Sequence, residues 1–261
     1  MNIGMIGGGN MGGALINGLW KKNTIFVCEQ DRAKMKRLSA RYKAVSSTVE
    51  EIAKKCPVII LAVKPQDMDA VLDGLKAVIR SKHLVISIAA GITSQYFEKR
   101  LGAKTRVVRA MPNMPAQIGE GVTALSKGKF ATAADLKKAA TLLKAVGKTV
   151  VVKEGEMDAV TAVSGSGPAY VFLFAECMIK AARSLGLKDS VARELVYETL
   201  LGSARQLKAL DDDPARLRAR VTSKGGTTQA ALEVLTGAKI EQVFQRALKA
   251  AKDRSQALAK K

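Results

Sequence analysis

The sequence predicts an α/β unit with a doubly wound, mainly parallel sheet over residues 1–155, followed by an all-α unit over residues 156–261. In the first half, short apolar runs typical of strands alternate with helical periodicity, which is the sequence form of βαβ units. A glycine-rich turn directly follows the first apolar run. After about residue 155 the strand-like runs stop and only helical periodicity remains.

The strands expected in the first unit are short and mostly apolar. They cover residues 2–6, 24–28, 58–63, 83–88, 106–109, 122–125 and 149–152. The run over 58–63 is apolar without interruption, as in a strand buried on both faces of a parallel sheet. Helices are expected over 14–22, 31–42 and 133–146, and Pro65 should open a further one.

Five helices are expected in the second unit, over residues 168–185, 190–210, 214–221, 227–235 and 240–258. Pro168 suits a helix start, and Gly186 suits the position just after a last turn. The first of these helices is apolar around most of its circumference until its basic end. A small helical unit can hardly bury such a helix alone, so we expect it to lie in a subunit interface.

The chain carries a formal net charge of +20, which indicates either a solvated basic surface or attraction of anions. Suitable anions would be a phosphorylated cofactor, a carboxylate substrate or nucleic acid. The basic residues are spread along the chain, only 4% of residues are aromatic, and no nucleic-acid-binding motif is present. We therefore expect no nucleic-acid partner.

Cysteine and histidine usage argues against metal and hydrolase chemistry. Cys28, Cys56 and Cys177 lie within apolar runs without metal or disulfide spacing, so we expect buried thiols in a reducing cytoplasm. His83, the only histidine, is isolated from every motif and is expected at the surface. A lone histidine disfavours a Ser-His-Asp hydrolase and a histidine-based metal site.

Neither export nor membrane insertion is expected. No basic region and cleavage site of a signal peptide is recognised near the start. The longest apolar run, residues 169–179, is interrupted by Glu176 and is too short to span a bilayer. These features favour a cytoplasmic protein without a membrane partner.

The glycine turn Gly7-Gly8-Gly9-Asn10-Met11-Gly12 matches G-x-G-x-x-G between an expected strand and helix. Its glycines allow a tight turn, close approach to a pyrophosphate, and packing of helix on strand. The phosphate would meet the positive end of the helix that begins near Asn10. This context predicts a Rossmann-type domain. The cofactor contacts expected here are Ile6, Gly7, Gly9, Asn10 and Met11.

Glu29 lies about 20 residues beyond the loop, where an acid accepts from a ribose 2′-hydroxyl and repels a 2′-phosphate. Arg32 and Lys34 follow closely and could instead bind a phosphate. All three could also be solvated charges at a helix start. The cofactor is therefore NADH or NADPH, with Glu29 favouring NADH.

Four further stretches, together with the glycine turn, give the chain a specific resemblance along nearly its whole length. They are Ala62-Val63-Lys64-Pro65-Gln66, Met111-Pro112-Asn113-Met114-Pro115, Ser164-Gly165-Ser166-Gly167-Pro168-Ala169-Tyr170 and Thr222-Ser223-Lys224-Gly225-Gly226-Thr227-Thr228. In order and spacing they resemble the pyrroline-5-carboxylate reductase family. The resemblance implies a Rossmann domain, a helical dimerisation domain, homodimers that often form larger rings, and hydride transfer from NAD(P)H to a ring C=N, the last step of proline biosynthesis.

The resemblance implies further cofactor contacts in the loops after two strands. They are Ala62, Val63, Lys64 and Pro65 after the 58–63 run, and Ile88, Ala89 and Ala90 after the next. Lys64 could equally be a structural ion-pair partner. The small residues of the second loop would let a nicotinamide ring approach the backbone, or could serve close packing alone. Asn113, stiffened by two prolines, could bond the carboxamide or the substrate, or be an ordinary turn asparagine.

The substrate is expected at residues 222–228, where Gly225, Gly226 and Thr227 should open a helix and expose backbone N–H groups to a carboxylate. Ser223 adds a hydroxyl donor. Resemblance assigns the Thr228 hydroxyl to the ring nitrogen, which makes it the expected catalytic residue. An ordinary helix cap after a glycine turn is the alternative.

Three positions depart from the family's usual residues. Lys224 stands where proline is usual, Ala219 where an acid is common, and Val49 where an asparagine is frequent. They leave cofactor preference and imine specificity open. The alternatives are a reductase of another cyclic imino acid and a non-catalytic dinucleotide-binding protein.

Overall fold

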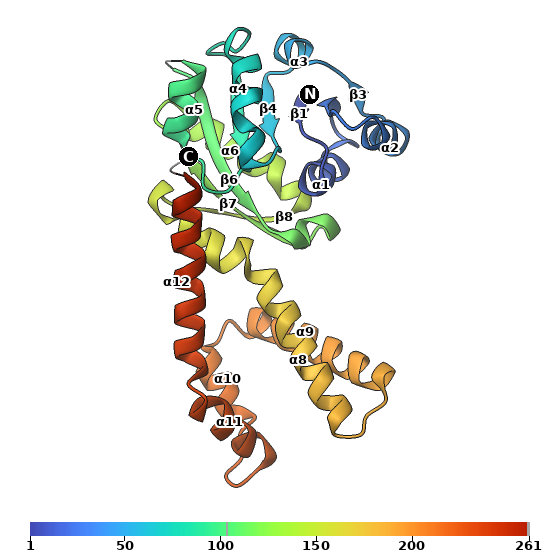
Figure 1. The fold of residues 1–261 in the computed structure, drawn as a ribbon, viewed down its shortest axis with the longest axis vertical. Helices are drawn as coiled ribbons and strands as arrows, with labels where there is room; N and C mark the ends of the chain where they lie inside the picture. Colours follow the sequence, from blue (N-terminus) through green and yellow to red (C-terminus); the bar gives the residue numbers. More distant parts are fainter. Residues whose placement is uncertain (103, 260–261) are drawn as a thin grey trace. The chain divides into compact units, whose positions relative to one another are not determined.

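The computed structural model describes residues 1–102 and 104–259, which divide into two compact units. One unit comprises Met1–Pro168 with Ala250–Lys261, and the other comprises Ala169–Lys249 (Figure 1). The first unit is α/β and the second is helical, so the predicted fold class is confirmed.

An eight-stranded sheet forms the centre of the first unit, in the order β3-β2-β1-β4-β5-β6-β7-β8. The strands are β1 Asn2–Ile6, β2 Thr24–Cys28, β3 Val45–Ser46, β4 Val58–Leu61, β5 Leu84–Ser87, β6 Arg106–Pro112, β7 Gly121–Lys127 and β8 Gly147–Val151. All neighbouring strands are parallel except β6 and β7. Strand order reverses about β1, and the edge formed by the carboxyl ends of β1 and β4 is where such sheets bind ligands.

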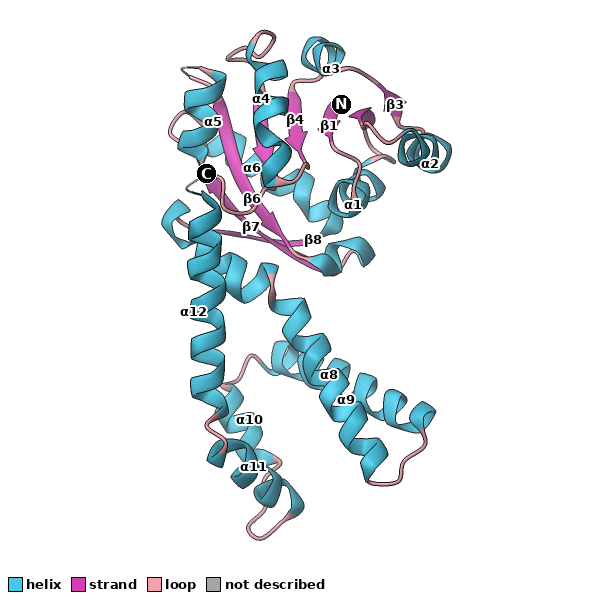
Figure 2. Ribbon diagram, viewed as in Figure 1, coloured by secondary structure: helices cyan, strands magenta, loops and turns pink. Residues whose placement is uncertain are grey.

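Helices cover both faces of this sheet (Figure 2). They are α1 Asn10–Leu19, α2 Arg32–Tyr42, α3 Val49–Lys55, α4 Met68–Lys76, α5 Ser94–Leu101 and α6 Ala133–Leu143. Two separate apolar clusters lie on the two faces. One combines Ile3 and Met5 of β1 with residues of α1, α2 and α6, and the other combines Ile6 with residues of α3, α4 and α5. Alternate residues of β1 therefore serve opposite faces.

Four short strands and α-helices and several boundaries differ from the expectation. β3, α3, α5 and α7 Met157–Val160 were not anticipated, β4 ends at Leu61, and β6 continues to Pro112. α3 is only seven residues long and depends on a capping box between Thr48 and Glu51. Elements of this length carry too little periodicity for recognition from sequence.

His83 is buried, with 1% of its surface exposed, so its expected surface position was wrong. Its Nδ1 accepts from the backbone N–H of Arg80 at 2.8 Å, and its Nε2 lies 2.8 Å from the carbonyl oxygen of Ala53. A carbonyl oxygen can only accept a hydrogen bond, so Nε2 is the donor to Ala53. The imidazole is buried because it satisfies backbone groups from two separate segments.

Replacing His83 with alanine should lower the free energy of unfolding by about 2–3 kcal/mol, because a buried N–H and a buried carbonyl lose their partners. Urea denaturation at fixed protein concentration measures this change. Thr141→Ala is the control, since it removes only an exposed bond to the Lys137 carbonyl and should cost under about 0.5 kcal/mol. Equal losses in both variants would contradict a structural role for His83.

The helical unit holds α8 Gly167–Ser184, α9 Asp189–Leu210, α10 Pro214–Arg220, α11 Thr227–Gly237 and the first half of α12 Ile240–Ala259. Gly186 takes φ +91° after α8, as expected for the residue beyond a last turn. The end of α12 returns to the first unit, where the Ser255 hydroxyl donates to Asp158 at 2.7 Å.

Helix α8 exposes much apolar surface in the single chain. Its residues Val171, Phe172, Leu173 and Phe174 are 43–60% exposed. By length and apolar composition alone, one stretch of the described residues, Glu154–Ser184, could cross a membrane. A helix covered by a second subunit shows the same exposure when a chain is viewed alone.

The cysteines were expected to be buried, which holds fully only for Cys56. Cys28 is partly buried, and Cys177 on α8 is exposed. Burial raises the pKa of the Cys56 thiol to about 11, so this thiol stays protonated near neutral pH.

Candidate functional site

The glycines of the turn between β1 and α1 have different spatial roles. Gly7 takes φ +97°, and a Cβ there would lie 2.6 Å from the carbonyl oxygen of Ala62. A Cβ on Gly12 would collide with the carbonyl oxygen of Gly7. A Cβ on Gly9 would meet no atom within 4 Å. The fold therefore requires Gly7 and Gly12, whereas Gly9 borders open space.

The N-terminus of α1 has no internal partner for its first amides. Gly9 occupies the N-cap position without a side-chain cap, and the first turn contains no acidic residue. Exposed N–H groups at the positive end of a helix suit an anion. The turn thus fits the pyrophosphate of a dinucleotide, with space for it beside Gly9.

Glu29 is fixed at the end of β2 by two backbone amides. Its carboxylate accepts from the N–H of Gly8 at 2.7 Å and from that of Asp31 at 2.8 Å. Asp31 caps α2, and the backbone N–H of Lys34 lowers the pKa of its carboxyl. The Lys34 ammonium lies 3.3 Å from the Asp31 carboxylate. Glu29 is therefore an anchored charge, which argues against a freely solvated one.

Basic residues of α2 line an open groove beside the glycine turn. The groove is bordered by Gly8, Gly9, Asn10, Gly13, Lys34, Arg37, Leu38, Arg41 and Tyr42. Its positive charge complements an anionic ligand at the turn.

The loops after β1, β4 and β5 lie at one edge of the sheet. The N–H of Ala62 donates to Ile6, and that of Ile88 donates to Leu61. Lys64 is exposed and makes no ion pair within the described part of the chain, which argues against a structural ion pair. The predicted contacts 62–65 and 88–90 thus leave neighbouring strands at the edge that carries the glycine turn.

A partly buried ionic cluster, not predicted from the sequence, lies at the end of the loop after β5. Glu154 accepts from the Ser94 N–H at 2.6 Å, from the Ser94 hydroxyl at 2.5 Å and from the Arg109 guanidinium at 3.1 Å. Burial raises the pKa of Glu154, but the hydrogen bonds from Ser94 and Arg109 outweigh it, so the pKa lies below its ordinary value. The carboxylate is therefore ionised at neutral pH.

The Met111–Pro115 and Ser164–Tyr170 stretches meet near the end of β6. The Asn113 side-chain oxygen accepts from the Val122 N–H at 2.9 Å, which leaves its amide N–H groups for a ligand. A Cβ on Gly165 would collide with Met111, so this glycine permits close packing. The buried hydroxyl of Ser164 makes no hydrogen bond within residues 1–102 and 104–259, and it lies in a π-helical turn.

The predicted substrate site, residues 222–228, belongs to the helical unit. Gly225 takes φ +71°, and its N–H donates to the Gln229 side chain at 2.8 Å. Gly226 is the N-cap of α11, again without a side-chain cap. A Cβ on Gly226 would collide with the Ser223 hydroxyl, so glycine lets this hydroxyl approach the helix start. Thr227 and Thr228 occupy the first turn, as predicted.

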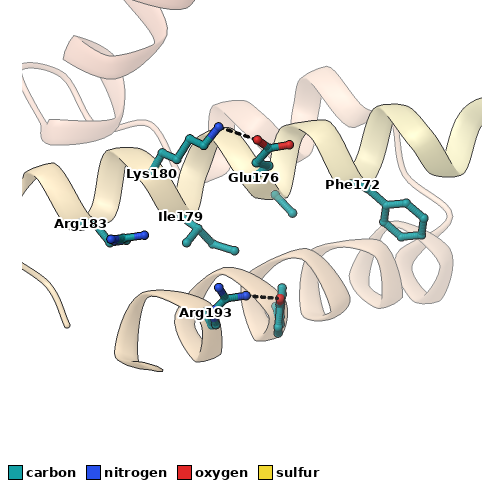
Figure 3. A pocket seen from close by; sticks show the side chains of 8 residues that line it. Phe172, Glu176, Ile179, Lys180, Arg183 and Arg193 are labelled. Atoms are coloured by element: carbon teal, nitrogen blue, oxygen red, sulfur yellow. Dashed lines mark hydrogen bonds and ion pairs between the residues drawn. The ribbon is translucent and has the colours of Figure 1, made fainter. Parts of the chain in front are cut away.

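A separate pocket between α8 and α9 is a poor candidate for the substrate (Figure 3). Its lining contains none of the predicted site residues. Lys180 pairs with Glu176 at 2.5 Å, and Arg193 and Arg183 share Asp189 at 2.6 and 3.5 Å, so each of its cations already has an acidic partner.

Two family models match separate parts of this chain. Residues 154–258 match the family model "Pyrroline-5-carboxylate reductase dimerisation", and residues 2–91 match "NADP oxidoreductase coenzyme F420-dependent". The pyrroline-5-carboxylate reductase of Mycobacterium leprae is 38% identical, covering 98% of this chain and 96% of the relative. The chain belongs to the pyrroline-5-carboxylate reductase family. This membership confirms the resemblance drawn from the five motifs.

Solved pyrroline-5-carboxylate reductases have the same fold throughout. The structure from Coxiella burnetii superposes with a TM-score of 0.92 at 35% identity, covering 100% of this chain and 99% of that one. The Plasmodium falciparum structure with NADP bound gives 0.90 at 31% identity, covering 99% and 98%. These relatives support a nicotinamide dinucleotide as cofactor, and the dimerisation model supports self-association through the helical region.

Proposed function

We propose that this chain reduces 1-pyrroline-5-carboxylate to proline with a reduced nicotinamide cofactor, as the last step of proline biosynthesis. The supporting observation is an uncapped, glycine-led helix N-terminus in each unit, at α1 and at α11. The first suits a diphosphate and the second a small carboxylate. A small carboxylate beside a nicotinamide dinucleotide is the ligand pair that this reaction uses.

The substrate carboxylate is assigned to Ser223, Gly225, Gly226 and Thr227, which supply hydroxyl and backbone N–H donors. The Thr228 hydroxyl is assigned to the ring nitrogen. Protonation of that nitrogen makes the neighbouring carbon electrophilic, so no strong enzymic acid is needed. Thr228 then stabilises the nitrogen as its charge is redistributed. The reduced nicotinamide supplies the hydride that converts the C=N bond to an amine.

The cofactor is assigned to the carboxyl edge of the sheet. Ile6, Gly7, Gly9, Asn10 and Met11 bind its diphosphate half, Glu29 its adenosine ribose, and 62–65 its middle. Residues 88–90 and Asn113 contact its nicotinamide half. The loops that contain residues 62–65 and 88–90 lie at the same edge of the sheet as the glycine turn, so one extended dinucleotide could contact all three.

The assembly proposed is a homodimer or larger homo-oligomer formed through the C-terminal helices. The exposed apolar face of α8 and the dimerisation model support it. The functional domains are then residues 1–155 for the cofactor and 156–261 for dimerisation and substrate. We place the protein in the cytoplasm, with no nucleic-acid or membrane partner, since self-association accounts for the apolar helix.

A spectrophotometric assay of reduced-nicotinamide oxidation, with 1-pyrroline-5-carboxylate and each cofactor in turn, tests this function. A panel of other cyclic imines separates it from a paralogue that prefers another imino acid, a possibility kept open by Lys224 and Ala219. Cofactor binding without turnover of any imine would instead indicate a non-catalytic dinucleotide-binding protein.

Between the two cofactors, we propose a preference for NADH. The Glu29 carboxylate is anchored where the adenosine ribose is assigned, and it would repel a 2′-phosphate. Lys34 does little to offset this charge, because Asp31 already pairs with it.

Glu29→Gln should raise the ratio of kcat/KM for NADPH to that for NADH by about tenfold, because the neutral amide no longer repels the phosphate. Steady-state rates with both cofactors measure the ratio. Glu194→Gln, at an exposed acid of the helical unit, makes the same change in net charge and should leave the ratio unaltered. An unchanged ratio in Glu29→Gln would refute the assignment of Glu29.

A further inference from the structure

Arg109 is a buried cation in a strand that is otherwise largely apolar. Its side chain is 6% exposed, and within β6 it pairs in register with Ser87, the last residue of β5. A buried guanidinium requires a charged partner. Glu154, which follows β8 in the chain, supplies the carboxylate at 3.1 Å.

Glu154 also binds the start of α5, beside the N-cap Thr93, whose side chain accepts from the Tyr96 N–H. Ser94 is the first residue of α5 and is 3% exposed. Its N–H is one of the amides that a helix start leaves without an internal partner. Both this N–H and the Ser94 hydroxyl donate to the Glu154 carboxylate, at 2.6 and 2.5 Å.

The segment between Ser87 and Ser94 is the loop that follows β5, residues 88–93. Its start is held by the pairing of Ser87 with Arg109 and by the Ser87 hydroxyl, which accepts from the Ala89 N–H at 3.3 Å. Its end is held by Glu154 through Ser94. The middle of the loop, Ala89-Ala90-Gly91, has small side chains with Gly91 at φ +78°, whereas Ile92 is buried in the core and Thr93 is the N-cap of α5.

We propose that Arg109 and Glu154 are positioning residues that act through Ser94 to fix loop 88–93 against the nicotinamide half of the cofactor. This proposal rests on the proposed function, because that function assigns the nicotinamide to residues 88–90. Glu154, which follows β8, thereby connects β6 through Arg109 and the start of α5 through Ser94. These contacts fix the relative positions of the three segments beside the nicotinamide half of the cofactor.

Glu154→Gln, with Ser94→Ala as the milder second variant, separates positioning from general stability. In cofactor-free protein, amide hydrogen exchange in peptides covering residues 88–93 should accelerate about tenfold. kcat should fall about ten- to hundredfold, because a small misplacement of the reacting groups is costly. The Kd for ADP-ribose, which lacks the nicotinamide, should stay within about twofold of the wild-type value.

The matched control is Arg106→Gln, at the first residue of the same strand. Arg106 pairs with Asp135 at 2.9 Å, so this variant also removes an ion pair of β6, but one remote from loop 88–93. It should leave exchange in the loop and kcat unchanged. Unchanged exchange in both Glu154→Gln and Ser94→Ala, or equal acceleration in Arg106→Gln, would overturn the proposal. Because exchange needs neither cofactor nor imine, it decides the positioning role even if the reductase assay is negative.

Discussion

Thr228→Ala is expected to lower kcat by about 100-fold, the loss typical of removing one preorganised donor at a reacting centre. Thr228 lies in the first turn of α11, after the uncapped N-cap Gly226. Its hydroxyl is assigned to the ring nitrogen, whose charge changes as the C=N bond is reduced. The cofactor is assigned to residues of the other unit, so its Kd should stay within about twofold. Steady-state rates and cofactor titration measure the two effects.

Two further variants make the test specific to this hydroxyl. Thr228→Ser retains the hydroxyl and should recover most of the lost activity. Thr236→Ala removes a hydroxyl near the end of the same helix, where it bonds only the carbonyls of Leu232 and Glu233, and should leave kcat unaltered. If Thr228→Ala weakened cofactor binding as much as it lowered kcat, the assignment to the substrate nitrogen would be wrong.

The parts of the fold that were predictable from sequence are those with strong local patterns. β1 and β2 have the predicted bounds, because each is a short, mostly apolar run, and the glycine turn and the helices on either side limit where it can begin and end. β6 was predicted to end at Arg109 but continues to Pro112, because Met111 pairs with Ala124 of the antiparallel strand β7. No local pattern encodes that long-range pairing.

The site shows the same contrast between local and distant determinants. The glycine turn and the start of α11 are contiguous motifs, so their geometry could be anticipated from a few residues. The Arg109–Glu154–Ser94 cluster joins positions 45 and 60 residues apart. The available signal was an arginine inside the apolar run of β6, since a charge there must find a buried partner. His83 was misjudged for a similar reason, because its partners come from a turn and from α3.

Gly9→Ala is expected to raise the cofactor Kd about 10- to 100-fold, equivalent to about 1.4–2.8 kcal/mol, without destabilising the protein. The backbone of Gly9 has φ −65°, which alanine adopts without strain. Its Cβ would meet no protein atom within 4 Å. The added methyl group would therefore occupy only the space assigned to the pyrophosphate. Cofactor titration and urea denaturation measure the two quantities.

Gly12→Ala should behave in the opposite way and serves as the contrast. Its Cβ would collide with the Gly7 carbonyl, so it should cost about 1–3 kcal/mol of stability in the absence of any cofactor. If Gly9 borders the ligand and Gly12 serves packing, Gly9→Ala weakens cofactor binding while the free energy of unfolding stays at the wild-type value. Gly12→Ala lowers the free energy of unfolding even without cofactor. A Gly9→Ala variant with wild-type cofactor affinity would show that the diphosphate does not lie at this turn, and the assignment of residues 62–65 and 88–90 would then fail with it.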